Sequence, residues 1–253
     1  MTLEVVGAHI RGRTRRVAGT AATALTVALL TGAASCSVSV GNGSSAPGAE
    51  GEAGSALAAV DELTVKGRAP KTGFDRARFG SAWADTDSNG CPTRDDILKR
   101  DLDGVKFSDG DCTVVSGTLT KDPYTGKEVT FRRGASKIDI DHVVALSDAW
   151  QKGAQKWDAS KRIALANDPL NLLAVDAGPN RSKGDGDTAT WLPPNKAYRC
   201  DYVAHQVAVK KKYELWVTTA ERDAMRKVLS GCPDRALPKG GNPTQAPSRF
   251  KAR

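Results

Sequence analysis

The stretch KIDIDHVVALSDAW, residues 137–150, decides the fold and the chemistry that the sequence predicts. It opens with alternating Ile and Asp residues, the pattern of a β-strand that buries one face. The strand reaches Asp141 and His142, a carboxylate and an imidazole that are adjacent in the chain. Neighbouring side chains of a strand point to opposite faces, so these two groups can serve one site only if the strand ends there. The residues that follow drift into helical spacing, which allows it.

Residues 1–36 predict an export signal. Residues 1–16 are basic, and residues 17–34 are apolar or small and carry no charge, as in a signal segment. This part is short for a membrane span, which needs roughly 20 mostly apolar residues, although an N-terminal anchor helix is the alternative. TGAASCS places Cys36 where a lipoprotein signal is cut and acylated, and TRRVAG matches a twin-arginine element. We expect an exported protein, either a cell-surface lipoprotein anchored to the membrane through Cys36 or a secreted protein.

The remaining chain divides by composition. Residues 37–58 are mostly Gly, Ser, Ala and Pro and predict a flexible linker. Residues 59–235 predict one domain of ordinary size, and residues 236–253 a disordered basic tail. The net charge of +8 and the pI near 9.3 suit an anionic partner such as nucleic acid or an envelope polymer. A solvated basic surface is the alternative, because part of the charge lies in the signal and the tail.

The cysteines predict two disulfides. With Cys36 set aside as a lipid attachment point, four of the five cysteines remain, and an exported chain meets an oxidising compartment. The pairings that are nearest in sequence are Cys91–Cys112 and Cys200–Cys232, and the two other connectivities stay open. A structural zinc site is disfavoured because the chain contains no C-x-x-C pair.

The order of the expected elements predicts an α+β domain, with strands in the first half and helices in the second. A helix is expected from a cap at Thr93, and a further helix from a capping box of Thr218 and Glu221. Tyr213 and Trp216 are expected in the core with the lysines of VKKKYELW outside. The other expected elements are strands at 111–120, 127–133, 138–142 and 171–176, a helix at 158–169, a turn at 177–185 and a helix at 201–217.

Asp141 and His142 suit the hydrolysis of a phosphodiester bond. That reaction needs a base for the attacking water and a positive charge for the phosphate oxygens. A histidine has a pKa close to neutral, and carboxylate and amide oxygens hold hard divalent cations. The segment NDPLNLLAVDAGPNRSKGD, residues 167–185, adds two amides, Asn171 and Asn180.

Through these motifs, residues 85–232 resemble an HNH endonuclease with the ββα-metal (His-Me finger) core. IDHVV, NLLAV and NRSKGD are similar to the HNH domain of RNA-guided CRISPR enzymes and to the C-terminal nuclease domain of GmrSD-type restriction enzymes. The wider pattern, from DPYTG to the Trp after KGD, resembles exported actinobacterial HNH proteins. The resemblance implies a ββα-metal core elaborated by an N-terminal strand and helix region and by two C-terminal helices.

The resemblance also implies a role for each polar residue. His142 is expected to be the general base, and Asp141 and Asn180 to hold one Mg²⁺, with Mn²⁺ as the alternative. Asn171 is expected to brace the loop and orient the histidine. Arg181 and Lys183 are expected to clamp the phosphate backbone, unless they form a solvated turn.

The function predicted on these grounds is that of an exported, metal-dependent endonuclease that cuts DNA, with RNA left open. Two alternatives remain from other classes. One is a non-catalytic envelope lipoprotein that binds nucleic acid or an anionic polymer on a nuclease scaffold. The other is a phosphodiesterase that acts on small or envelope substrates.

Overall fold

The computed structural model describes residues 51–108 and 110–252. The predicted export signal, Cys36 and most of the predicted linker lie outside the described residues. In the part of the chain that is described, no helix combines the length and the apolar character needed to cross a bilayer.

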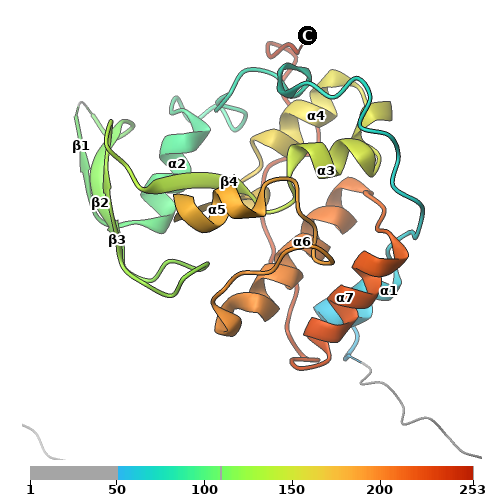
Figure 1. Cartoon of the computed structure of the whole chain (residues 1–253). Helices are drawn as coiled ribbons and strands as arrows, with labels where there is room; N and C mark the ends of the chain where they lie inside the picture. The colour runs from blue at the N-terminus through green and yellow to red at the C-terminus, as the bar shows by residue number, and fades with distance from the viewer. Residues whose placement is uncertain (1–50, 109, 253) are drawn as a thin grey trace, which may run out of the picture. The chain divides into compact units, whose positions relative to one another are not determined.

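The described residues form two antiparallel sheets flanked by helices (Figure 1). The first sheet has the order β1-β2-β3, from β1 (Asp103–Phe107), β2 (Val114–Leu119) and β3 (Val129–Arg132). The second sheet pairs β4 (Ile138–His142) with β5 (Leu172–Asp176). The α+β class predicted from the sequence is therefore confirmed.

Helices make up most of the remaining regular structure. The α-helices are α1 (Ala56–Asp61), α2 (Thr93–Asp101), α3 (Leu146–Gln151), α4 (Ala159–Ala166), α5 (Ala177–Lys183), α6 (Arg199–Tyr213) and α7 (Thr219–Leu229). Short 3₁₀ turns lie at Arg76–Phe79, Ala154–Lys156, Pro169–Asn171 and Lys196–Tyr198.

Three local predictions were wrong in detail. The strand β1 was not expected, and α5 occupies the segment that was expected to be a turn. Thr93 is the first residue of α2 rather than its cap, because its hydroxyl donates to the carbonyl of Ala84 at 2.6 Å. Thr218 does cap α7 by accepting from the backbone N–H of Glu221.

Strand β4, strand β5 and helix α5 form one unit. Asp141 lies opposite Leu173 in the register, and α5 begins directly after β5 and lies alongside β4 (Figure 1). The alternation of β4 places Ile138 and Ile140 against the hydrophobic side chains of α2, β2 and β3. Its aspartates therefore face the other way, toward α5. Residues 143–171 link the two strands and contain α3 and α4.

Both predicted disulfides are confirmed. Cys91 is bonded to Cys112 across a sequence separation of 21 residues, and Cys200 to Cys232 across 32. The first joins the start of α2 to the β1–β2 connection, and the second joins the start of α6 to the end of α7.

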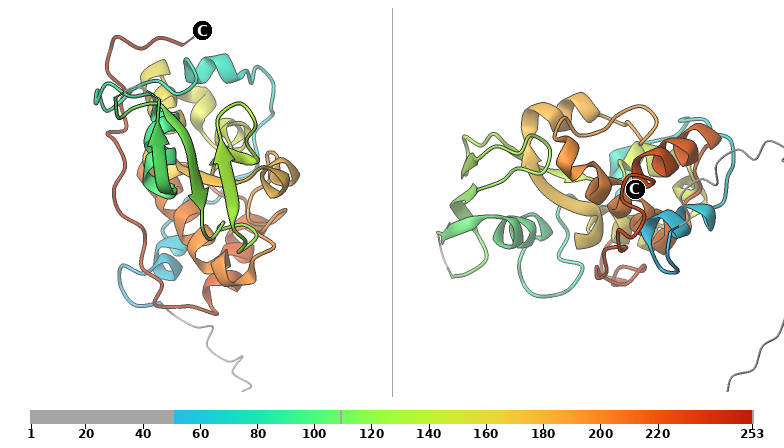
Figure 2. Two further views of the ribbon diagram at one scale, coloured as in Figure 1. Left: turned by 90° about the vertical axis from the view of Figure 1, so that its left-hand side faces the viewer. Right: turned by 90° about the horizontal axis from the view of Figure 1, so that it is seen from below.

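The predicted domain boundaries were too narrow at both ends. Helix α1 lies partly within the expected linker, and its Leu57 is buried against α6 and α7. Residues 236–252 are ordered rather than a free tail, and Figure 2 shows this dark red segment running along one side of the molecule. Ala246 exchanges backbone and side-chain hydrogen bonds with Ser160 of α4. Gly241 has a φ of +85°, and a Cβ there would collide with Asp168.

Buried charges hold the helical half together. The ammonium of Lys152 lies 2.6 Å from Asp148, 2.8 Å from Asp187 and 2.6 Å from Glu221, and all four side chains are at most 2 % exposed. The ammonium of Lys210 contacts the same Asp148 and Glu221 at 3.0 Å each. The expectation that the lysines of VKKKYELW lie outside is therefore wrong for Lys210, which is fully buried because carboxylates surround its ammonium.

The pKa shifts in this network set the pH range in which it stabilises the fold. Burial alone raises the pKa of Asp148, but Lys210 and Lys152 outweigh it and hold that pKa below the ordinary 3.8. Burial alone lowers the pKa of Lys210, but Asp148 and Glu221 outweigh it and raise that pKa above the ordinary 10.5. The stability from Asp148 is present above its ordinary pKa and lost as the pH falls through the lowered one. The stability from Lys210 is present below its ordinary pKa and lost as the pH rises through the raised one.

Glu221→Gln should lower the free energy of unfolding by about 3–5 kcal/mol, because it leaves two buried ammonium groups with one carboxylate fewer. Urea denaturation followed by circular dichroism measures this. Glu62→Gln is the matched control, since Glu62 pairs with Lys211 on the surface, and its cost should stay below about 1 kcal/mol. Equal costs for the two variants would contradict a structural role of the network.

Candidate functional site

His142 ends β4 and is held as a neutral imidazole. Its ring is 8 % exposed, and its Nε2 lies 2.9 Å from the carbonyl oxygen of Ala166 at the end of α4. A carbonyl only accepts, so Nε2 carries the proton and Nδ1 keeps the lone pair. Among the described residues, Nδ1 has no hydrogen-bond partner. Burial lowers the pKa of His142 to about 4, helped by the positive charges of Arg76 and Lys183 and opposed by the bond to Ala166.

Asp141 is a buried carboxylate with two strong partners. The hydroxyl of Tyr124, from the turn between β2 and β3, donates to it at 2.5 Å, and the ammonium of Lys183 lies 2.9 Å away. Burial raises the pKa of Asp141 above its ordinary 3.8, because it outweighs the lowering by Lys183 and by the hydroxyl of Tyr124. Asp141 is thus fixed in position from β4 by groups on two other segments.

Lys183 lies inside the protein, which corrects the prediction that it clamps a phosphate. Its side chain is 0 % exposed, and its ammonium also donates to the backbone carbonyl of His142 at 2.8 Å. Lys183 therefore joins the last turn of α5 to the end of β4. An ammonium that is enclosed in this way cannot reach a nucleic-acid backbone in this conformation.

Asn180 and Arg181, in the middle of α5, both contact Asp139. The amide nitrogen of Asn180 donates to the Asp139 carboxylate at 3.2 Å, and Arg181 Nε lies 3.5 Å from the same oxygen. Asp139 thereby holds the Asn180 amide by its nitrogen and leaves its oxygen as the acceptor. Arg181 is 74 % exposed and remains available to an external anion.

Asn171 is the last residue of the long connection between β4 and β5, and it hydrogen-bonds back to the start of that connection, just after His142. Its side-chain oxygen accepts from the backbone N–H of Val144 at 2.8 Å, and its amide donates to the carbonyls of Val144 and Leu165 at 3.3 Å each. Asn171 is fully buried and does not touch the imidazole. Asn171 thereby links the backbone of Val144, two residues after His142, to the backbone of Leu165.

These groups border one hollow of about 480 Å³. Asp141, His142 and Asn180 line it, together with Asp139 and two arginines, Arg76 and Arg94. The predicted base and metal ligands therefore line one hollow. Asn171 and Lys183 do not line it, but they hydrogen-bond to the residues beside it.

Residues 76–83 form a wall beside the hollow, and the residues at its two ends, Arg76 and Trp83, line the hollow. Trp83 has a φ of +60°, a left-handed conformation that costs roughly 1–2 kcal/mol for a residue with a side chain. Its ring lies within 12° of parallel to the ring of His142, with centroids 6.3 Å apart. The guanidinium of Arg94 lies 5.7 Å from the centroid of the Trp83 ring.

Comparison with known proteins assigns the chain to a family. A family model described as GmrSD restriction endonucleases, C-terminal domain, matches residues 92–228. The chain belongs to this family. It is also 40 % identical over 182 residues to an "Uncharacterized secreted protein" of Arthroderma benhamiae, across 71 % of this chain and 86 % of that protein. No solved structure matches the chain.

The GmrSD C-terminal family places this chain among nuclease-like domains, and the resemblance to HNH enzymes implies a divalent cation at Asp141 and Asn180. The two side chains line the same hollow and offer only hard oxygen donors, which suit Mg²⁺ or Mn²⁺. A carboxylate has about four acceptor positions, so Asp141 can accept from Tyr124 and Lys183 and still bind a cation. The donor set fits such an ion.

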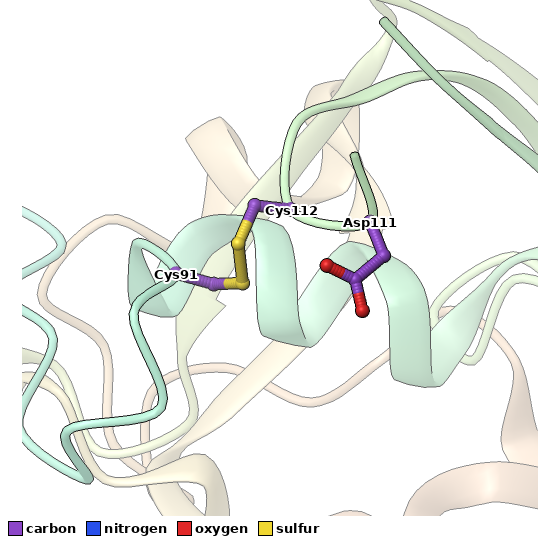
Figure 3. Close-up of side chains that lie close together, drawn as sticks. All are labelled: Cys91, Asp111 and Cys112. Carbon is purple, nitrogen blue, oxygen red and sulfur yellow. A yellow bond between two sulfur atoms is a disulfide. The ribbon is translucent and has the colours of Figure 1, made fainter. Parts of the chain in front are cut away.

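A second group of potential ligands does not form a metal centre. Within the described ranges, one trio of His, Cys, Asp or Glu side chains brings its ligand atoms within 4.8 Å of one another, namely Cys91, Asp111 and Cys112 (Figure 3). The two sulfur atoms are bonded to each other, and a disulfide offers no thiolate to a metal.

Four residues at this site were not predicted from the sequence. Tyr124 lies in the quoted turn KDPYTG, but nothing local shows that it reaches Asp141. Arg76, Trp83 and Arg94 precede the matching motifs or lie at their edge, and only the folded chain brings them to the hollow. The alternation in β4 does single out Asp139.

The ring of His142 should stay neutral between about pH 8 and pH 5, because its pKa is lowered from the ordinary value of about 6.5. It should take up a proton only as the pH approaches 4. Nitrogen-15 NMR of the imidazole in the metal-free protein measures this and also shows which nitrogen is protonated. A midpoint near the ordinary value, or a proton on Nδ1 at neutral pH, would contradict the described environment.

Proposed function

We propose that the protein is an exported, metal-dependent endonuclease that hydrolyses phosphodiester bonds in DNA. The observation that carries the proposal is the state of His142. Its bond to Ala166 sets the tautomer and leaves the Nδ1 lone pair for a proton, beside a hollow that is also lined by Asp141 and Asn180. A neutral imidazole with an unpaired nitrogen is the form that a general base requires.

The charges around the hollow suit a phosphodiester. Arg76 and Arg94 line it, and Arg181 is exposed at its α5 side. A phosphate bound there would meet these cationic groups, which would hold the scissile bond near the imidazole. His142 would then accept the proton of the attacking water.

A divalent cation, when bound by Asp141 and Asn180, would supply positive charge for the phosphate oxygens. The residues of this chain prepare that position in two ways. Lys183 and Tyr124 hold the carboxylate of Asp141. Asp139 holds the Asn180 amide by its nitrogen and presents its oxygen.

The comparisons support the proposal at the level of class. The family is that of a restriction endonuclease domain, which favours nucleic acid as the substrate. The relative from Arthroderma benhamiae is named as secreted, and the two disulfides suit an oxidising compartment. Both observations favour export, whereas the lipid anchor at Cys36 rests on the sequence motif alone.

Purified protein should nick supercoiled plasmid with Mg²⁺ or Mn²⁺, and EDTA should stop the reaction until metal is restored. His142→Ala should lower the rate by roughly 10²–10⁴-fold, the usual contribution of a general base. Gel electrophoresis of the relaxed plasmid measures the rate.

His205→Ala is the matched control, because His205 lies in α6 and, among the described residues, hydrogen-bonds only to the carbonyl of Asp201. It should nick at the wild-type rate. Nicking by His142→Ala at the rate of the control would refute the assigned base. Turnover of a small phosphodiester with intact plasmid would favour a phosphodiesterase instead.

A further inference from the structure

The wall of residues 76–83 lies before the region that matches the family, residues 92–228, and of its residues only Arg76 has been given a role in the proposed reaction. It is nevertheless firmly held. Arg162 donates to the backbone carbonyl of Arg78 at 2.8 Å, and the N–H of Thr93 donates to the carbonyl of Trp83 at 3.3 Å. Gly80 has a φ of +82° and packs so close to Ile163 that a Cβ would collide with that side chain. The wall is therefore a built part of the surface next to His142.

A second, smaller hollow lies within this wall. Its volume is about 140 Å³, and its lining includes Phe79, Trp83, His142 and Leu146. An apolar cavity of about 150 Å³ is known to hold a single benzene ring. The smaller hollow is thus of a size that accepts one six-membered ring, whereas the fused rings of a purine would require the wall to move.

Trp83 connects the two hollows. Trp83 lines both of them, and its ring is nearly parallel to the imidazole of His142. The Arg94 guanidinium lies near the same ring. In the part of the chain that the structure describes, the indole nitrogen of Trp83 has no hydrogen-bond partner. An aromatic ring beside a guanidinium is the surface on which proteins stack unpaired nucleobases.

We propose that Trp83 and the smaller hollow form a subsite for one unpaired nucleobase of pyrimidine size. The subsite lies next to the phosphodiester bond that water attacks with His142 as the general base. The proposal rests on the proposed nuclease function and names its substrate class. A base within a duplex is stacked on both faces and cannot reach Trp83. The site therefore takes single-stranded or locally melted nucleic acid with a pyrimidine at the cut.

The first test measures binding without divalent metal, so that no cleavage occurs. Fluorescence anisotropy compares oligothymidylate, oligoadenylate and an abasic strand, each of about twelve nucleotides. Oligothymidylate should bind to the wild type on the order of tenfold more tightly than the abasic strand, because one base stacks on the protein. Oligoadenylate should bind more weakly than oligothymidylate. Equal binding of oligothymidylate and the abasic strand would overturn the proposal without any variant.

Variants then assign the effect to one residue. Trp83→Ala should reduce the binding of oligothymidylate to that of the abasic strand, and Trp83→Phe should keep most of it because a flat ring remains. Trp216→Phe is the control, since Trp216 bonds to Gly67 and lines neither hollow. Wild-type binding by Trp83→Ala would overturn the proposal.

Cleavage with Mg²⁺ or Mn²⁺ separates the two proposals. Trp83→Ala should raise KM for oligothymidylate more than it lowers kcat, and the wild type should cut single strands faster than duplex. If the wild type binds oligothymidylate through Trp83 but cuts nothing, the nuclease function fails and the subsite stands. If it cuts duplex, oligoadenylate and oligothymidylate alike, the subsite fails and the nuclease function stands.

Discussion

The contact on which the site depends is made by the ammonium of Lys183, buried between the carboxylate of Asp141 and the backbone carbonyl of His142. Burying a lone cation or a lone carboxylate is costly, whereas the two together, with the hydroxyl of Tyr124, satisfy one another. This contact fastens helix α5 to the last two residues of β4. Because α5 also carries Asn180, the same contact sets where the amide lies relative to the imidazole.

A second group of buried charges lies among the helices. Lys152 and Lys210 share the carboxylates of Asp148 and Glu221, and these four side chains come from α3, the residue after it, α6 and α7. Helix α3 follows directly from the residues that Asn171 braces. Among the described residues, seven acidic and four basic side chains are buried, so burial removes more negative than positive charge from the surface.

Short-range patterns predicted the elements of this fold better than they predicted its contacts. The alternation in residues 138–142 gave β4, and the apolar run at 172–176 gave β5, because period and burial are local properties of a strand. The spacing of Asp141, His142 and Asn180 brought the three residues to one hollow. Lys183 was assigned to the substrate because it follows Asn180 closely in the NRSKGD motif, and only the packing of α5 shows that it faces inward. Trp83 was not singled out, since it lies about sixty residues before His142 and meets it only in the folded chain.

The C-terminal segment has a consequence for the order in which the molecule is completed. Asn242 donates its backbone N–H to Asp168, Lys212 joins both, and Ala246 bonds to Ser160. Ser160 lies near the start of α4 and Asp168 just after its end, and the carbonyl of Ala166 at the end of this helix accepts from His142. A nascent chain still threaded through a ribosome or a translocon lacks these closing contacts. The support beneath the imidazole is therefore completed only by residues 242–246, which are synthesised after every strand and helix of the domain.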